Sequence, residues 1–309
     1  MKIVYPEVKI RDVWRIFWQA MREHLPSLGL GLSGSILGST FVILTPVFYK
    51  KFFDAIVSFV GDKNTLVPEL FKIILIVLGL NLVMWASWRL SGLAINRFQT
   101  NVMAKLKQRA FDAMILHSHS FFVNNFGGAL VQRVSRFSRS FERLADRVVY
   151  DLLSLFVKIA GIGVVVWLIN PSLSALIIFW VVVFFVLNYF FARWKLKYDI
   201  KQAASDSATT AVLADAITNH QAIALFNGHD RESGNIKQVS NHQAWTTRVA
   251  WDVDLLGISI QSALVILLEF IVMYAAVYYW KLDLITAGTF VLLQVYVVDL
   301  GEKVFSFSR

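Results

Sequence analysis

The stretch ALVQRVSRFSRSFERLADRVV, residues 129–149, is the most informative part of the sequence because it places two different patterns on one helix. Its apolar residues recur every three or four positions, as in a heptad seam: Leu130, Val134, Phe137, Phe141, Leu144 and Val148. Its arginines fall on the opposite side at about 100° per residue: Arg133, Arg136, Arg139, Arg143 and Arg147. The stretch predicts a long helix that packs along a second helix and exposes a basic face.

The preceding residues supply that second helix. Its apolar residues recur every four positions: Phe98, Val102, Leu106, Ala110 and Met114. The periodicity stops at residues 117–128, HSHSFFVNNFGG, where Asn-Asn and Gly-Gly favour a turn. We therefore predict a helical hairpin over residues 94–147. Its tip carries three phenylalanines, which either contact a partner surface or pack against helices of the same chain.

The composition is that of a membrane protein, since 57% of the 309 residues are hydrophobic, 17% are charged and the mean hydropathy is +0.58. Soluble domains average about 45–50% apolar and about 25% charged residues. A membrane-spanning helix needs about 20 mostly apolar residues. Six segments meet that requirement: residues 25–48, 71–93, 148–168, 173–193, 255–280 and 287–305. The prediction is one all-α membrane domain over residues 1–309, with a second polar extension at 194–254.

Lysine and arginine fix the expected orientation, because they collect on the cytoplasmic side of membrane proteins. With a cytoplasmic N-terminus, most of the 30 basic residues fall inside and only five fall outside: Lys50, Lys51, Lys63, Lys72 and Lys281. Residues 10–22 place Val13, Ile16, Phe17 and Met21 opposite arginines, which predicts an amphipathic helix at the membrane surface. The net charge of +9 is thus explained by topology, and no nucleic-acid partner is expected.

A family resemblance rests on both extensions. The run from Phe121 to Val134, FFVNNFGGALVQRV, resembles the first intracellular loop of ABC exporters, with a two-aromatic turn, a glycine and Leu-x-x-Arg. The run from Leu213 to Asp230, LADAITNHQAIALFNGHD, is similar to the family's second loop, with a small-residue helix and a terminal aromatic. An amphipathic elbow followed by six spans agrees as well, so the likeness covers almost the whole chain.

The resemblance implies two short coupling helices that lie parallel to the membrane and dock on a cytoplasmic ATPase domain. They would lie around 121–125 and 219–226, and the residues that it assigns to docking are Phe121, Phe122, Asn124, Asn125, Asn219, His220, Ile223 and Phe226. It also implies a second copy or a paralogue as partner, with the fourth and fifth helices crossing to it. ATP and Mg²⁺ would bind to the ATPase domain, and no cofactor to this chain.

The chain departs from the family pattern in one respect, since no G-x-x-x-x-G-K-[ST] phosphate loop occurs in it. We expect no ATP hydrolysis by these residues alone. Three explanations remain: a truncated half-transporter, a separate ATPase subunit, or no ATPase. The first is preferred, because the sixth helix of such proteins usually extends further into the cytoplasm than Arg309.

Charged residues inside the expected spans cost about 2.5–3.5 kcal/mol each at the bilayer centre. Lys158, Glu269 and Asp299 should therefore face protein or a water-filled cavity. Glu269 and Asp299 either contact a cationic or polar substrate, or one of them forms a structural ion pair with Lys158. We expect no metal site, because no carboxylate or thiol lies near His117 and His119 in the sequence.

The function that this sequence favours is export of an amphipathic lipid, peptide or drug by alternating access, in the cytoplasmic membrane of a prokaryote. The alternative is a proton-coupled peptide transporter of the same fold without an ATPase, with Glu269 or Asp299 as the protonation site. A membrane enzyme ranks third, because the sequence shows no catalytic triad, paired carboxylates or metal-ligand cluster. The absence of cysteine excludes disulfides and thiol catalysis.

Overall fold

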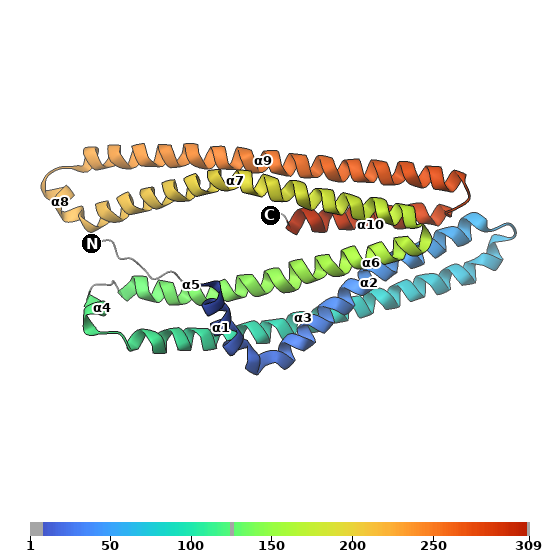
Figure 1. Ribbon diagram of the computed structural model, residues 1–309, viewed down its shortest axis with the longest axis horizontal. Helices are drawn as coiled ribbons and strands as arrows, with labels where there is room; N and C mark the ends of the chain where they lie inside the picture. Colours follow the sequence, from blue (N-terminus) through green and yellow to red (C-terminus); the bar gives the residue numbers. More distant parts are fainter. Residues whose placement is uncertain (1–8, 124–126, 308–309) are drawn as a thin grey trace. The chain divides into compact units, whose positions relative to one another are not determined.

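The computed structural model describes residues 9–123 and 127–307, and every regular element within these ranges is a helix (Figure 1). The prediction of an all-α fold is confirmed. In chain order the elements are α1 (Ile10–Met21), η1 (Arg22–His24), α2 (Leu25–Ser58), α3 (Lys63–Ile115), α4 (His119–Val123), α5 (Gly127–Asp146), η2 (Arg147–Leu153), α6 (Ser154–Ile169), α7 (Pro171–Thr218), α8 (His220–Leu225), α9 (His229–Lys281) and α10 (Ala287–Phe307).

Five helices in the described residues are long and apolar enough to cross a membrane: Ile10–Ser58, Lys63–Ile115, Gly127–Ile169, Pro171–Thr218 and His229–Lys281. The longest have 53 residues, or about 80 Å at 1.5 Å per residue, against a hydrocarbon core of about 30 Å. Helix α10 is shorter, with 21 residues, and carries Asp299, Glu302 and Lys303 in its second half. Because it carries these three charges, α10 lacks the long, nearly uncharged apolar stretch that each of the five long helices contains. The structure confirms a protein with several long apolar helices, but the six-span arrangement stays a prediction.

The described residues form two compact units, and the larger one contains those of 9–174 and 275–307. Within it, small residues bring α2 and α3 together. The Ser35 hydroxyl lies 2.7 Å from that of Ser91, which in turn donates to the Gly31 carbonyl at 2.7 Å. A Cβ built on Gly34 would lie 2.9 Å from the Ser91 Cβ, so only glycine permits this approach. Close backbone contact through small residues is how helices associate without a hydrophobic driving force.

Helix α1 and the polar halves of α3 and α5 share an aromatic core. Phe17 of α1, Phe98 of α3 and Phe141 of α5 are all buried, and the Phe17 and Phe141 ring centroids lie 5.3 Å apart. Lys105 of α3 forms an ion pair with Glu23 of η1. The amphipathic helix at the N-terminus therefore packs on α3 through Phe17, while Trp14 and Trp18 are exposed.

The apolar seam of α5 follows the sequence pattern as far as Phe141. Leu130 and Phe141 are buried as expected, but Leu144 and Val148 are 42% and 44% exposed. Ala145 packs against the aromatic core, and Val149 is buried. Residues Arg147–Leu153 form a π-helical segment, whose wider turn does not follow the 3.6-residue period. The heptad extrapolation was thus one residue out of register at this end.

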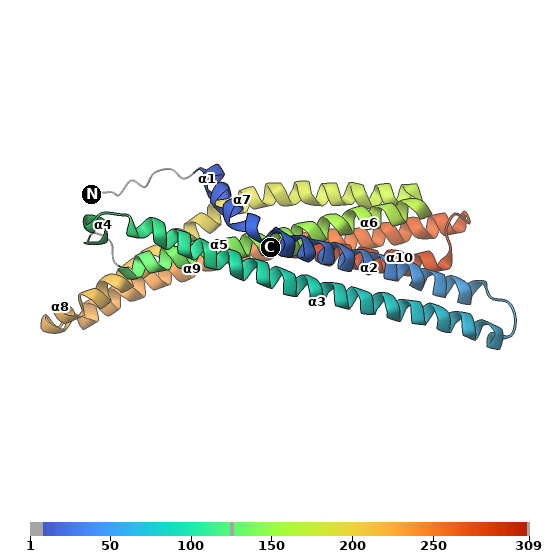
Figure 2. The same cartoon turned by 90° about the horizontal axis from the view of Figure 1, so that it is seen from below.

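The second unit contains residues 175–274, which include most of α7 and α9. These helices run antiparallel in one register, as three side-chain pairs show. Gln243 donates to Asp206 at 2.7 Å, Lys195 forms an ion pair with Asp254, and Gln261 donates to Asn188 at 2.5 Å. Equal steps along both helices connect the pairs, so α7 and α9 form one extended hairpin, with α8 at its end (Figure 2).

Candidate functional site at the hairpin tips

Helix α4, His119–Val123, lies at the end of the α3–α5 hairpin. The Phe121 amide donates to the Ser118 carbonyl at 3.0 Å and starts this short helix. The rings of His117 and Phe121 lie 4.4 Å apart, and those of Phe121 and Phe122 lie 5.4 Å apart in an edge-on arrangement. Phe121 is half-buried and Phe122 is exposed. The tip therefore presents at least one aromatic ring to solvent.

The sequence-based prediction places the first coupling helix around residues 121–125, which extends beyond Val123. Asn124 and Asn125, which the prediction assigns to docking, lie outside the described residues. Gly127 begins α5, and a Cβ built on it would meet nothing within 4 Å. For the first tip, the described geometry is that of His117, Phe121 and Phe122.

Helix α8, His220–Leu225, lies between α7 and α9 at the second tip. Asn219 precedes it with φ −97°, and its side chain donates to the Asp215 carboxylate at 2.9 Å. At the other end Asn227 has φ +50°, and the Gly228 amide donates to the Ile223 carbonyl at 2.8 Å. A left-handed residue directly after a helix is the usual way to end it sharply. Local sequence thus fixes both ends of α8.

The surface of the second tip is apolar on one side and hollow on another. Leu225 and Phe226 are 81% and 84% exposed, whereas Ile223 is half-buried. A hollow of about 470 Å³ is lined by Asp215, Asn219, Ile223, Phe226, Arg231 and Glu232, among others. Asn219 and His220 are exposed as well. Leu225 is absent from the sequence-based set, although its position beside Phe226 in a polar hairpin would have indicated it.

Both tips expose large apolar side chains, Phe122 at the first and Leu225 and Phe226 at the second. Large exposed apolar side chains that gather at one place on a protein surface are typical of interaction sites. The helices behind each tip are continuous, with 53 residues in α3 and 53 in α9. A continuous helix transmits a displacement of its end along its length. The arrangement is suited to mechanical coupling.

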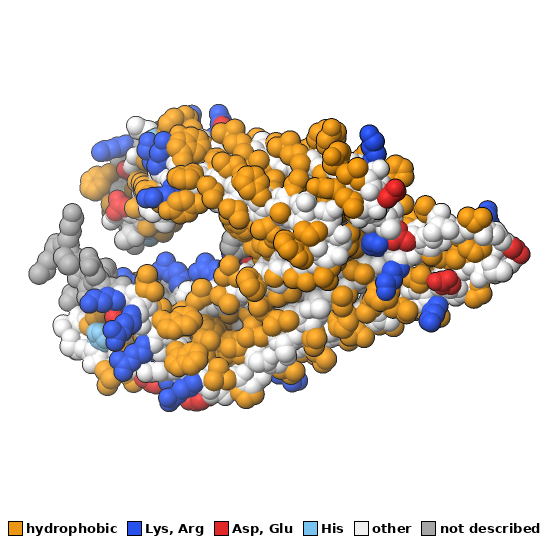
Figure 3. All heavy atoms as spheres, turned by 45° about the vertical axis from the view of Figure 1, so that its right-hand side comes forward, with side chains coloured by type: hydrophobic (Ala, Val, Ile, Leu, Met, Phe, Trp, Pro, Cys, Tyr) orange, Lys and Arg blue, Asp and Glu red, His pale blue; other side chains and the backbone are white. Residues whose placement is uncertain are grey.

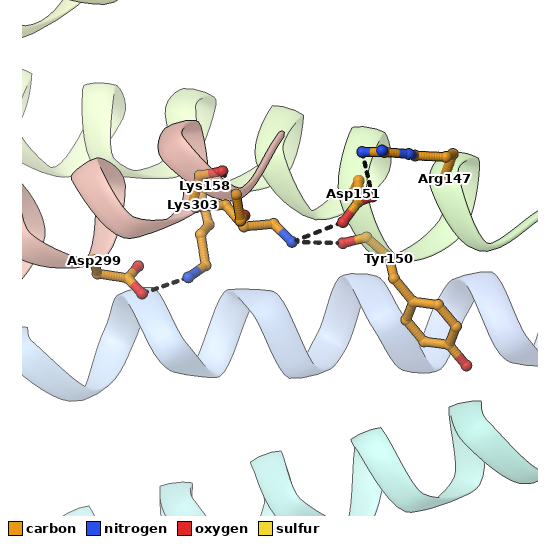
Figure 4. A network of polar contacts seen from close by, with 7 residues as sticks. Arg147, Tyr150, Asp151, Lys158, Asp299 and Lys303 are labelled. Carbon is orange, nitrogen blue, oxygen red and sulfur yellow. Dashed lines mark hydrogen bonds and ion pairs between the residues drawn. The ribbon is translucent and has the colours of Figure 1, made fainter. Parts of the chain in front are cut away.

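The charged residues within the expected spans form the second candidate site. Lys158 Nζ of α6 lies 2.5 Å from Asp299 Oδ1 of α10 (Figure 4). Further along α10, Lys303 Nζ donates to the Tyr150 carbonyl at 2.7 Å and lies 3.6 Å from Asp151. Arg147 contacts the other Asp151 oxygen at 3.3 Å. The structure thus brings two of the three predicted residues together, in a network that ties α10 to η2 and α6.

Glu269, the third predicted residue, belongs to the other compact unit. It lies on α9 and is half-buried. Asp151 and Lys303 are in the network but were missed by sequence reasoning. Asp151 stands at the fourth position of an expected span, and Lys303 stands near the end of another. Charges at such positions look like ordinary span ends, and only the antiparallel register of α6 and α10 shows that they meet.

Long apolar helices with exposed hydrophobic side chains define the class: this is an integral membrane protein that crosses the bilayer several times. Hydrophobic side chains cover much of the face seen in Figure 3, and most charged ones lie toward the left and the right of that view. A family model described as the ABC transporter transmembrane region matches residues 28–300. The chain therefore belongs to the family of ABC transporter transmembrane regions.

Among solved structures, the chain is similar to one described as a bacterial Atm1-family ABC exporter with ATP bound. The TM-score is 0.73 at 18% sequence identity, over 93% of this chain and 51% of that chain. The present chain thus spans about half the length of that exporter chain, and at this identity the likeness shows the fold. No curated protein matches the sequence.

Proposed function

We propose that this chain is the membrane part of an ATP-driven exporter that moves an amphipathic lipid, peptide or drug across the bilayer by alternating access. Its family and its exporter fold support this function. ATP and Mg²⁺ bind to an ATPase domain outside these 309 residues, because the sequence contains no G-x-x-x-x-G-K-[ST] loop. Two such membrane parts, from two copies or a paralogue, enclose the translocation path. α10 acts as the sixth span, and the N-terminus is cytoplasmic.

The observation that carries the proposal is the second tip. Leu225 and Phe226 expose most of their surface at the end of an extended, mostly polar hairpin, next to a hollow that can receive a partner side chain. In the proposed complex, α4 and α8 are the coupling helices that contact the ATPase domain. When ATP draws two ATPase domains together, the hairpins carry this movement to the spans.

The test uses the complete transporter, with its ATPase domain, reconstituted in proteoliposomes. The probes are a fluorescent phospholipid, a labelled peptide and a cationic dye, and the two readouts are ATP-dependent probe movement and ATP hydrolysis. Phe226→Ala removes an exposed ring that touches no core, so the protein should fold normally. Because the docking contact weakens, probe movement per ATP hydrolysed should fall at least threefold, as expected for truncation of an interface residue worth about 1 kcal/mol.

The matched control is Ile200→Ala, which truncates an exposed apolar side chain on α7, away from the tip. This variant should couple ATP hydrolysis to transport as the unchanged protein does. Equal coupling in the Phe226→Ala and Ile200→Ala variants would refute the role of the tip. ATP-independent movement of all three probes would refute the ATP-driven function itself.

The alternative is a proton-coupled peptide transporter, for which Glu269 and Asp299 are the candidate protonation sites. Asp299 lies in an ion pair with Lys158, and Glu269 is half-buried on α9. A pH gradient without ATP would then drive uptake of the labelled peptide. Neutralising the protonation site, by Glu269→Gln or by Asp299→Asn, would abolish that uptake, whereas an ATP-driven exporter shows no peptide movement under the same gradient.

A further inference from the structure

The α7–α9 hairpin contains a groove of about 400 Å³, a volume within the range of ligand pockets. Its walls are apolar and include Phe191, Trp194 and Ile260. A Cβ built on Gly257 would lie 2.4 Å from Phe191, so the missing side chain allows the Phe191 ring to lie against the backbone of α9. The groove is therefore a shaped feature of this helix pair.

The floor of the groove contains an amide pair. Gln261 donates to Asn188 Oδ1 at 2.5 Å, and Gln261 is only 8% exposed. Asn188 also donates to the Phe184 carbonyl at 2.9 Å. These bonds hold both side chains in place, so the groove has a fixed polar spot in a mostly apolar lining. An occupant with a long apolar part and a small polar group fits such a surface.

One end of the groove coincides with the edge of the apolar segments. Beyond Trp194, helix α7 continues with Lys195 and Lys197, and Lys195 is paired with Asp254 of α9. Lys197 Nζ instead lies over the rings of Trp194 and Tyr198, 5.4 Å and 4.9 Å from their centroids. The exposed Lys197 ammonium group thus lies against Trp194, which itself lines the groove. Tryptophan beside lysine at the end of an apolar run is typical of the membrane interface.

We propose that this groove binds an anionic phospholipid of the surrounding leaflet. One acyl chain lies along the apolar walls toward Leu264, the glycerol region lies near the Asn188–Gln261 pair, and the phosphate lies beside Lys197. A phospholipid is the occupant because it is the amphipath present at this depth, and the lysine beside Trp194 selects a negative headgroup. The site belongs to the hairpin itself, and its occupancy does not depend on transport of any substrate.

Native mass spectrometry of the delipidated complete protein tests this site. The protein is titrated with phosphatidylglycerol and, separately, with phosphatidylcholine of the same acyl chains. Lys197→Ala should weaken phosphatidylglycerol binding about fivefold, since a basic residue near an anionic lipid surface contributes about that factor. Binding of phosphatidylcholine should be unchanged. Ile260→Trp places a large ring at the rim of the groove, and both lipids should then lose the tightest binding step.

Matched controls on the same helices separate a site from general adsorption. Lys201→Ala removes an exposed lysine of α7 one turn further on, and Ile266→Trp enlarges an exposed apolar residue of α9 that does not line the groove. Both controls should bind the two lipids as the unchanged protein does. The proposal is overturned if Ile260→Trp and Ile266→Trp behave alike, or if Lys201→Ala weakens phosphatidylglycerol binding as much as Lys197→Ala. Gln261→Leu gives a second check, because it removes the amide near the glycerol region and should weaken the binding of both lipids.

Discussion

Lys158 and Asp299, which are far apart in the sequence, form an ion pair 2.5 Å long between α6 and α10. Their side chains are 12% and 27% exposed, so neither charge is fully solvated. One helical turn along α10, Lys303 meets Asp151 and the Tyr150 carbonyl of η2. The η2–α6 segment carries Asp151 before Lys158, and α10 carries Asp299 before Lys303, so both contacts form when the two segments run antiparallel.

Breaking the Lys158–Asp299 pair from one side should destabilise the protein. Asp299→Asn leaves the ammonium group without its partner in a low-dielectric environment, and such losses cost about 3 kcal/mol. The midpoint of thermal unfolding in detergent, followed by tryptophan fluorescence, should fall clearly. The double exchange Lys158→Asp with Asp299→Lys restores the pair and should recover most of the loss. If the double variant is less stable than Asp299→Asn, the pair does not fix the register.

The close approach of α2 and α3 makes Gly34 intolerant of a side chain. A Cβ on Gly34 would lie 2.9 Å from the Ser91 Cβ and 3.0 Å from the Ser87 carbonyl oxygen, and neither neighbour is a flexible side-chain end. Gly34→Ala should therefore cost about 1–3 kcal/mol, as overpacking usually does. Gly79→Ala on α3 is the control, because nothing lies within 4 Å there. It should leave the unfolding midpoint unchanged or raise it slightly. Equal effects of the two variants would contradict the close-packed interface.

The long helices, the amphipathic N-terminus and the hairpin could be predicted because they depend on local periodicity. Phe98, Val102 and Leu106 recur every four residues and are buried as that pattern requires. The same periodicity misplaced Leu144 and Val148, at the end where α5 passes into the π-helical segment Arg147–Leu153. A π-helical turn depends on packing and leaves no simple repeat in the sequence.

The contacts between distant segments could be predicted only in part. A lysine in an apolar run indicates that a carboxylate partner is needed, but Glu269 and Asp299 satisfied that condition equally well in the sequence. The choice depends on how α6 and α10 align, which periodicity does not fix. The α7–α9 groove was not predicted, because it depends on Gly257 facing Phe191 across two helices.

Asp54 at the end of α2 should contribute to stability by capping α10. Its carboxylate accepts hydrogen bonds from the Gly288 amide at 2.7 Å, the Thr286 hydroxyl at 2.9 Å and Lys50 at 2.7 Å. A carboxylate on the first amides of a helix satisfies free donors and interacts well with the helix dipole. Asp54→Ala should cost about 1–2 kcal/mol, measured as the unfolding midpoint.

The control for Asp54 lies one turn away. The Ser58 hydroxyl donates only to the Asp54 carbonyl of its own helix, at 2.7 Å. Ser58→Ala should therefore change the free energy of unfolding by no more than about 0.5 kcal/mol. A loss in Ser58→Ala as large as that in Asp54→Ala would mean that the end of α2 is sensitive to any change, and that the cap is not responsible.

The sharp end of α8 should control how rigidly the second tip is held. Asn227 has φ +50°, a conformation that costs most residues about 1–2 kcal/mol and that glycine and asparagine accept. Asn227→Val should strain the turn and weaken the Gly228–Ile223 hydrogen bond, so the amides of Ile223–Gly228 should exchange with deuterium about tenfold faster or more. Asn227→Gly should keep their protection, and Asn235→Val on the exposed face of α9 should leave it unchanged.

The same variants test the function of the second tip. Because α8 presents Leu225 and Phe226, Asn227→Val should also lose coupling between ATP hydrolysis and probe movement, while Asn227→Gly keeps it. Faster exchange with full coupling would show that the partner surface, and not the turn at Asn227, holds α8 in its working position.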